Sequence, residues 1–258
     1  MPLLLLEEIL AGLVVGTLIG LSGLGGGVAL LPILIFGLRV PPIVAVGTAA
    51  AFNALTKVWA GWIHWRNQTV NWPLVLALAA GSLPGTFLGV LILAHLRTVY
   101  GVGVNDILRN FIGVLLVAVP LFLLIQGQLG KFITIRKRFP QEIYPAIVAI
   151  GFGAGFLVGM SSVGSGTVIM ALLLMFVQCP PVVLVGTDIT HAVALTGVTG
   201  LLDWHLGTVD FSLVFPLLIG SIPGSVLGVK LSTVLPGQWL RYVLCVILMA
   251  SGARMLWV

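Results

Sequence analysis

Two patches of small residues, one in each half of the chain, have the composition of an anion-binding turn. The first reads Ser22-Gly23-Leu24-Gly25-Gly26-Gly27 and the second Ser161-Ser162-Val163-Gly164-Ser165-Gly166. A helix that starts after such a turn presents unpaired backbone N–H groups and the positive end of its dipole, and the serines add hydroxyl donors. This combination suits a small oxyanion held without a metal or a cofactor, although glycines also serve tight turns and close helix packing. Because two matched patches occur, we assign substrate binding to Ser22, Gly23, Gly25, Gly26, Gly27, Ser161, Ser162, Gly164, Ser165 and Gly166.

A lysine stands deep inside an apolar stretch, residues 43–65. Lys57 lies one helical turn beyond Asn53, so the two side chains share a helix face. A lysine within a membrane span is costly and is a functional candidate for that reason. The alternative is that Lys57 extends to the interface near Trp65, but about 12 Å of helix separates them, which is long for its side chain. We therefore assign Asn53 and Lys57 to substrate binding.

A carboxylate and an imidazole share one face of the stretch 182–204. Asp188 and His191 are spaced i, i+3, and such a pair can relay a proton, since histidine titrates near neutral pH. An equally weighted alternative makes Asp188 an acid at a helix start and His191 a core residue. The remaining ionisable groups at span ends lie close to tryptophans, and we expect the interface to solvate them. These groups are His64, His95, Arg97, Asp203, His205 and Asp210.

The composition requires an apolar solvent around the protein. Of 258 residues, 59% are hydrophobic and only 7% are charged, and the mean hydropathy is +1.21. A soluble domain needs a far more polar surface, so the chain is a multispanning membrane protein that binds no nucleic acid. Cys179 and Cys245 lack metal spacing and are expected to be packing residues. No Ser-His-Asp or two-metal arrangement is present in the sequence, so we do not expect an enzyme.

The spans belong to an internal repeat. Residues 16–96 align without a gap on residues 155–235. Each half opens with a segment, 5–37 or 143–177, that a glycine-rich patch divides, and broken backbone at membrane depth must be buried in protein or line a cavity. We expect an all-α integral membrane protein of two homologous repeats, each a glycine-broken helical hairpin plus three transmembrane helices. The six full spans are 43–65, 72–95, 108–126, 182–204, 210–231 and 239–258.

The charges indicate how the two repeats are oriented. The first repeat, residues 1–126, is joined to the second, residues 143–258, by a basic linker at 127–142 that is expected to stay in the cytoplasm. The loop 65–71 then lies inside and carries Arg66, whereas the matching loop 204–210 carries only acidic charge. Matched loops whose charges have opposite sign are expected on opposite sides of the membrane, and this predicts an inverted repeat. Parallel repeats remain the alternative if only one arm of each hairpin crosses the membrane.

A second repeated motif combines glycine, serine and proline. Gly81-Ser82-x-Pro84-Gly85-x-x-x-Gly89 recurs as Gly220-Ser221-x-Pro223-Gly224-x-x-x-Gly228. Glycines four residues apart allow two helices to approach closely. We interpret this motif as helix packing rather than as a binding site.

The glycine patches resemble those of the TauE/SafE family, the sulfite exporter-like membrane proteins. The resemblance rests on Gly16, Gly20, Ser22, Gly23, Gly25, Gly26, Gly27 and Pro32 in the first half, on Gly151, Gly153, Gly155, Gly159, Ser161, Ser162, Gly164, Ser165 and Gly166 in the second, and on the pairs Gly47-Thr48 and Gly186-Thr187. It implies a secondary transporter in the bacterial inner membrane that exports sulfur-containing anions, such as sulfite or two-carbon sulfonates like sulfoacetate.

The functional hypothesis is a proton-coupled anion exporter that works by alternating access. Asn53, Lys57 and the serines bind the anion, and Asp188 and His191 couple protons. The alternatives are a passive anion channel, an uptake permease for a related oxyanion, and a membrane scaffold without flux. The expected partners are a small anion and the bilayer, and a homodimer is a further hypothesis.

Overall fold

The protein is helical throughout the part of the chain that its structure describes. The structure is a computed structural model that describes residues 2–22, 27–129, 144–164, 166–177, 179–232 and 237–257, and it contains no β-sheet in these ranges. The expected all-α class is confirmed. Along the chain the helices are α1 (Pro2–Ser22), α2 (Gly27–Pro32), the π-helical turn η1 (Ile33–Gly37), α3 (Pro42–Arg66), α4 (Trp72–Tyr100), the 3-10 turn η2 (Gly101–Gly103), α5 (Val104–Leu129), α6 (Tyr144–Ser161), α7 (Thr167–Phe176), α8 (Pro181–His205), α9 (Phe211–Ser232) and α10 (Gly237–Trp257).

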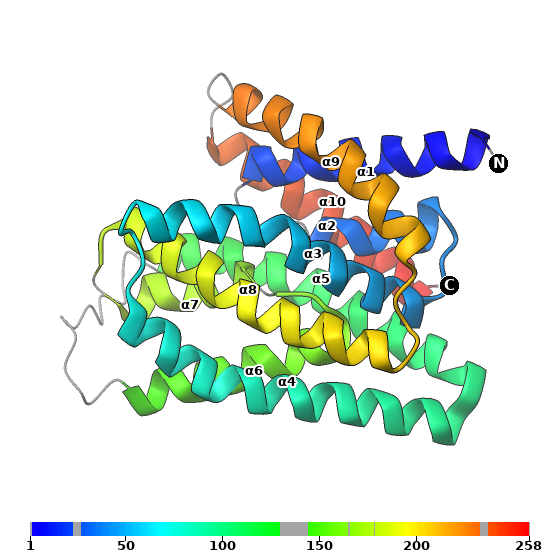
Figure 1. Cartoon of the computed structure of the whole chain (residues 1–258), viewed down its shortest axis with the longest axis horizontal. Helices are drawn as coiled ribbons and strands as arrows, with labels where there is room; N and C mark the ends of the chain where they lie inside the picture. Colours follow the sequence, from blue (N-terminus) through cyan, green and yellow to red (C-terminus); the bar gives the residue numbers. More distant parts are fainter. Residues whose placement is uncertain are drawn as a thin grey trace.

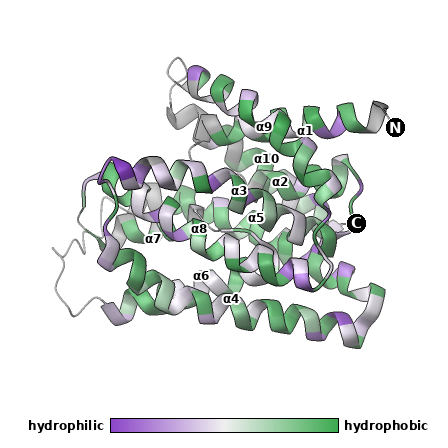
Figure 2. Ribbon diagram, viewed as in Figure 1, coloured by the Kyte–Doolittle hydropathy of each residue, from purple (hydrophilic) through white to green (hydrophobic). Residues whose placement is uncertain are grey.

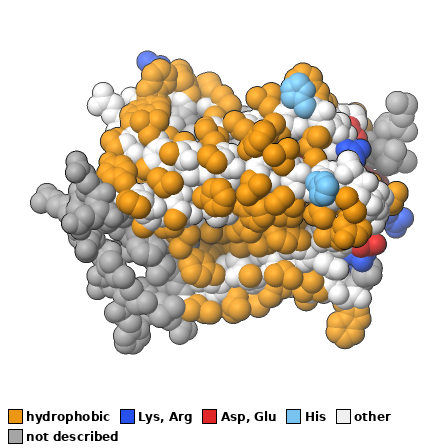
Figure 3. All heavy atoms as spheres, turned by 90° about the horizontal axis from the view of Figure 1, so that it is seen from below, with side chains coloured by type: hydrophobic (Ala, Val, Ile, Leu, Met, Phe, Trp, Pro, Cys, Tyr) orange, Lys and Arg blue, Asp and Glu red, His pale blue; other side chains and the backbone are white. Residues whose placement is uncertain are grey.

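Several helices are long and apolar enough to cross a bilayer. The stretches that qualify are Pro42–Arg66, Trp72–Ile125, Tyr144–Ser161, Val182–His205 and Phe211–Gly228, and the second of them covers both α4 and α5. Hydrophobic residues run along most of the helices (Figure 2). On the face seen in Figure 3 they also dominate the surface, and most of the visible charged side chains lie toward one end. This is the pattern of a multi-pass membrane protein.

Most of the expected spans coincide with these stretches. The expected spans 43–65, 72–95, 108–126, 182–204 and 210–231 fall on α3, α4, α5, α8 and α9. The last one, 239–258, falls on α10, whose apolar part is shorter, Cys245–Trp257. The chain turns back after α1 and after α6, so that α2 and α7 run against the helices that precede them (Figure 1). The linker residues 130–142 lie outside the described ranges.

Matched residues begin and end the helices of the two halves. Pro42 and Pro181 begin α3 and α8, where proline costs no helical hydrogen bond. The turn after each of these helices reaches a positive φ at the same place in the repeat, 54° at Gln68 and 67° at Gly207. The repeat therefore extends to single turn residues. Equivalent side chains then cap the next helix: Asn71 Oδ1 accepts from the Leu74 N–H (3.2 Å), and Asp210 Oδ1 accepts from the Ser212 N–H (2.9 Å).

The two halves interleave rather than pack as separate blocks. Helix α1 packs along α9, α6 packs along α4, α3 packs along α8, and α5 packs along α10 (Figure 1). Every one of these pairs takes one helix from each half. The fold thus places α3 and α8, which carry the candidate ionisable residues, against each other.

Glycines set the closeness of two of these pairs. A methyl group on Gly81 would overlap the Val148 carbonyl of α6, and one on the matching Gly220 would overlap the Ile9 carbonyl of α1. Five residues after Gly81, Thr86 Oγ1 of α4 donates to the Gly155 carbonyl of α6 at 3.1 Å. The packing interpretation of the glycine–proline motif is confirmed for these positions.

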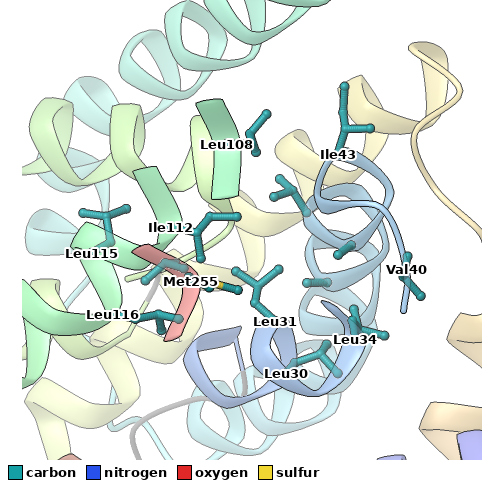
Figure 4. Close-up of a cluster of buried hydrophobic side chains, with 14 of the residues drawn as sticks. Leu30, Leu31, Leu34, Val40, Ile43, Leu108, Ile112, Leu115, Leu116 and Met255 are labelled. Atoms are coloured by element: carbon teal, nitrogen blue, oxygen red, sulfur yellow. The ribbon is translucent and has the colours of Figure 1, made fainter. Parts of the chain in front are cut away.

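Hydrophobic side chains fill the space between the hairpins and the spanning helices. In Figure 4, Leu31 of α2 points toward Met255 of α10 and Ile112 of α5, whereas Leu30 of α2 and Leu34 of η1 lie on the side of Val40, and all of these side chains are buried. A second cluster joins α4, α6, α7 and α8 through Leu78, Ile147, Ile169 and Leu195, among others. Each short helix after a glycine patch is therefore enclosed by protein, as broken backbone at membrane depth requires.

Candidate functional site

Helices α3 and α8 lie side by side and run in opposite directions in the middle of the molecule (Figure 1). Late in α3, Gly61 lies against Val193 and Thr190, which are early in α8. Early in α3, Ala51 lies against Gly200, which is late in α8. The two contacts are equivalent under the repeat, so the same surfaces of the two helices meet each other twice.

The ends of this helix pair are joined by reciprocal hydrogen bonds. The Asn71 N–H donates to Thr187 Oγ1 (3.0 Å), and the Asp210 N–H donates to Thr48 Oγ1 (3.1 Å). Asn71 matches Asp210 in the repeat, and Thr48 matches Thr187. Each half thus supplies the turn at one end of the helix pair and the threonine at the other end.

Four polar side chains are buried where α3 and α8 meet. Asn53 and His191 are 0% exposed, Lys57 is 9% exposed and Asp188 is 7% exposed. The ammonium group of Lys57 is close enough to interact electrostatically with both the Asp188 carboxylate and the His191 ring. Buried charges of opposite sign compensate part of each other's desolvation. Groups that the sequence predicted separately, one set in each half, therefore form one cluster.

Helix α4 contributes a third wall to the cluster. Ser82 is fully buried, and its hydroxyl lies 2.7 Å from Nε2 of His191. This hydrogen bond fixes the orientation of the imidazole ring. Ser82 was expected to belong to a packing motif only, so the sequence analysis missed this contact. The sequence offered one signal for this contact: Ser82 stands next to Gly81 in the motif whose glycines face another helix.

Several polar atoms around Lys57 have no hydrogen-bond partner among the described residues. They are the amide oxygen and nitrogen of Asn53, Oδ1 of Asp188, Oγ1 of Thr190 and Nδ1 of His191. Native proteins leave few buried polar atoms unpaired, and most such atoms meet a water molecule or a ligand. The concentration of these atoms at one helix crossing, next to a buried ammonium group, is the arrangement expected of a binding site for a small polar solute.

The second glycine patch begins at the end of α6. Ser161 Oγ donates to the Leu157 carbonyl (2.7 Å) and accepts from the Val163 N–H (3.2 Å), so this hydroxyl is engaged in ending the helix. Ser162 has a φ of 56°, is fully buried, and its hydroxyl has no partner within the described ranges. Val163 belongs to the same buried cluster as Phe52, the neighbour of Asn53. Of the two described serines in this patch, Ser161 and Ser162, it is Ser162 whose hydroxyl is available for a ligand.

The remaining patch residues are described only in part. Gly164 has a φ of 97°, a conformation that favours glycine, and Gly166 directly precedes α7. Ser22 ends α1 and Gly27 begins α2. Gly23, Gly25, Gly26 and Ser165 lie outside the described residues.

Five of the six groups that were expected at the interface are exposed or partly buried, and one is fully buried. His95, Arg97 and His205 are exposed, and His64 and Asp210 are partly buried. Asp203 is instead 1% exposed, so the expectation that solvent surrounds it is wrong. The turn after α8 folds back so that the Thr208 carbonyl lies against Gly47 of α3, close to the end of α8 that carries Asp203.

The fold and the buried cluster define a polytopic helical membrane protein with a polar site enclosed between two halves. A sequence profile described as sulfite exporter TauE/SafE matches residues 8–255. The chain therefore belongs to the TauE/SafE family. The comparison with solved structures gives no significant match.

Curated relatives align over nearly the whole chain. The probable membrane transporter protein YjnA of Bacillus subtilis is 35% identical over 251 residues, which cover 96% of this chain and 98% of the relative. The probable membrane transporter protein YunE of the same organism is 23% identical over 270 residues, with 96% of each chain covered. The probable membrane transporter protein MJ0441 of Methanocaldococcus jannaschii is 27% identical over 270 residues, which cover 98% of this chain and 96% of the relative. These names indicate membrane transport rather than enzymatic activity.

Proposed function

We propose that this protein is a secondary transporter that exports small sulfur-containing anions, sulfite or two-carbon sulfonates such as sulfoacetate, across the bacterial inner membrane. The observation that carries the proposal is the buried cluster of Asn53, Lys57, Asp188 and His191, in which polar atoms without partners surround an ammonium group. A sulfonate or sulfite oxygen accepts hydrogen bonds from such donors and is attracted by the positive charge. The family name supports the substrate class.

The two glycine patches are proposed to complete this site. Ser162 and Gly164 stand at the end of α6, and Val163 between them belongs to the same buried hydrophobic cluster as Phe52 of α3. In the proposed mechanism, the backbone N–H groups beside the patches bind oxygens of the anion that Lys57 attracts. Ser161 is assigned a positioning role, because its hydroxyl is engaged by the backbone.

An inverted repeat is proposed as the basis of alternating access. The antiparallel run of α3 and α8 and the reciprocal hydrogen bonds at their two ends support it. In such an architecture, the two ends of the helix pair are equivalent, so the contacts that close one end can open while those at the other end remain closed. The two repeats, 1–126 and 143–258, then act as the moving units.

The orientation is testable with single cysteines at matched turns. In a background where Cys179 and Cys245 are replaced by serine, Arg66→Cys and His205→Cys occupy equivalent positions of the repeat. We expect a membrane-impermeant thiol reagent to label His205→Cys in intact cells and Arg66→Cys only after the cells are opened. Labelling of both residues from the same side would contradict the inverted arrangement.

Flux measurements in proteoliposomes test the proposed function itself. A transporter is expected to show saturable uptake of radiolabelled sulfite, and unlabelled sulfite or sulfoacetate inside the vesicles should stimulate that uptake by counterflow. A passive channel would instead pass current without saturation. Complete absence of flux and of sulfite binding would favour a scaffold role.

His191 is expected to govern the response of transport to a pH gradient. His191→Gln retains a side chain that can bond to Ser82 but cannot take up a proton, so transport should continue while its stimulation by a pH gradient is reduced. His205→Gln removes an exposed histidine from the same helix and is the matched control. An unchanged pH response in His191→Gln would remove this residue from the coupling mechanism.

A further inference from the structure

A buried carboxylate lies far from the central cluster, at the end of α8. Asp203 is about 22 Å along the helix from Asp188. It is 1% exposed, and neither of its carboxylate oxygens has a hydrogen-bond partner among the described residues. The hydroxyl of Thr208 lies beside it but donates to the Asp203 backbone carbonyl, at 2.9 Å. The repeat places His64 at the matching position, so the acid occurs at only one end of the helix pair.

Charged groups surround this end of the molecule, but none forms an ion pair with Asp203 within the described ranges. On α4, the Arg97 guanidinium donates to the Leu206 carbonyl at 2.8 Å. At the start of α9, the Asp210 carboxylate caps the helix, and its charge interacts with Glu8 of α1. On α8 itself, His205 is exposed and stacks on Trp204. On α3, Gly47 and Thr48 contact Thr208 and Asp210 of the turn after α8, and neither carries a charge.

The environment of Asp203 differs from that of Asp188 in one decisive respect. Asp188 is buried next to Lys57, whose positive charge compensates its own. No such cation is paired with Asp203 in the part of the chain that the structure describes, and an isolated ionised carboxylate is strongly disfavoured inside a protein. Binding a proton removes the charge. A hard metal cation would need several oxygen ligands, and no group of three or more acidic, histidine or cysteine side chains is found in the searched, described residues.

We propose that Asp203 is a proton-binding site at the end of the α3–α8 pair, where the transporter exchanges its coupling proton with the solution on the side of the loop 206–210. This inference rests on the proposed transport function. When this end is closed, Gly47 and the Thr48–Asp210 hydrogen bond hold the turn against α3, and Asp203 is enclosed and protonated. When the contact opens, water reaches the carboxylate, and the carboxylate releases its proton. The ionised carboxylate then disfavours closure of this end, because closure would bury its charge. Proton binding and closure of this end are thereby linked.

Transport assays with Asp203→Asn test the proposal. The variant should retain exchange of radiolabelled sulfite between two equal pools, because a permanently neutral side chain permits closure. It should lose the stimulation of net transport by a pH gradient. Asp210→Asn removes a nearby carboxylate but retains an amide oxygen to cap α9, so both activities should be preserved. A full pH response in Asp203→Asn, or a wild-type protein driven by sodium instead of protons, would overturn the proposal.

Infrared spectroscopy of the purified protein provides a readout that does not depend on transport. The wild type should show a protonated-carboxyl band at neutral pH that is absent from Asp203→Asn and shifted in Asp203→Glu. If this band is present while the wild type shows no saturable flux, the transport function fails and the proton site stands. If neither variant changes the carboxyl bands, the proton site is wrong, whatever the flux.

Discussion

Lys57→Met is expected to abolish sulfite binding and to lower the free energy of unfolding by about 3–5 kcal/mol, the cost of leaving a buried charge without the opposite charge that compensates it. The loss has two sources. The anion loses the ammonium group that attracts it, and the Asp188 carboxylate, 7% exposed, loses the charge that compensates it. Thermal unfolding in detergent measures the stability, and equilibrium binding of radiolabelled sulfite measures the affinity.

A double variant separates these two effects. Lys57→Met combined with Asp188→Asn removes both charges together, so most of the stability should return while sulfite binding stays absent. Lys230→Met, at an exposed position near the end of α9, is the control for removal of a lysine and should change neither property. Sulfite binding at wild-type affinity in the double variant would show that the ammonium group of Lys57 does not bind the anion.

Gly81→Ala is expected to destabilise the protein by about 1–3 kcal/mol, the usual cost of overpacking an interior contact. The added methyl group would overlap the Val148 carbonyl of α6, and backbone on both sides of the contact leaves little room to adjust. The matching substitution Gly220→Ala should have a comparable effect, because its methyl group would overlap the Ile9 carbonyl of α1. The unfolding temperatures of the purified variants measure both effects.

Gly153→Ala is the matched control for the glycine substitutions. Gly153 lies on α6, in the same helix pair as Gly81, but a methyl group there meets nothing within 4 Å. Alanine is the better helix former by about 1 kcal/mol, so this variant should be as stable as the wild type or slightly more stable. A similar loss of stability in Gly81→Ala and Gly153→Ala would show that close approach of the helices is not the reason for glycine.

The sequence predicted the helices and the role of the glycines because both depend on local patterns. Span length and hydropathy located α3, α4, α5, α8 and α9. The four-residue spacing of Gly81, Gly85 and Gly89 identified a face that touches another helix, but the identity of that helix did not follow from the spacing. The pairing of α4 with α6 joins different halves of the chain, and no local signal records it.

The candidate site was predicted in its residues but not in its arrangement. Lys57 and Asp188 were recognised because charges are rare in membrane spans, and two lone charges of opposite sign on equivalent helices were an unused signal for a pair. Asp203 was misjudged because its place at a helix end, next to Trp204, is typical of an interfacial residue. Its burial, at 1% exposed, is a property of the tertiary structure that its position in the sequence does not reveal.

The exchange of helices between the halves has a consequence for biosynthesis. The ribosome completes α1 first, but α9, the helix that α1 packs along, is nearly the last to be made. During the intervening synthesis, Gly12 and Gly16 of α1, which in the finished protein lie against Leu217 and Ser221 of α9, face lipid or the insertion machinery instead. Native assembly of this polypeptide therefore awaits its carboxyl-terminal part, and chains that terminate after the first half lack the neighbours of α1, α3, α4 and α5 alike.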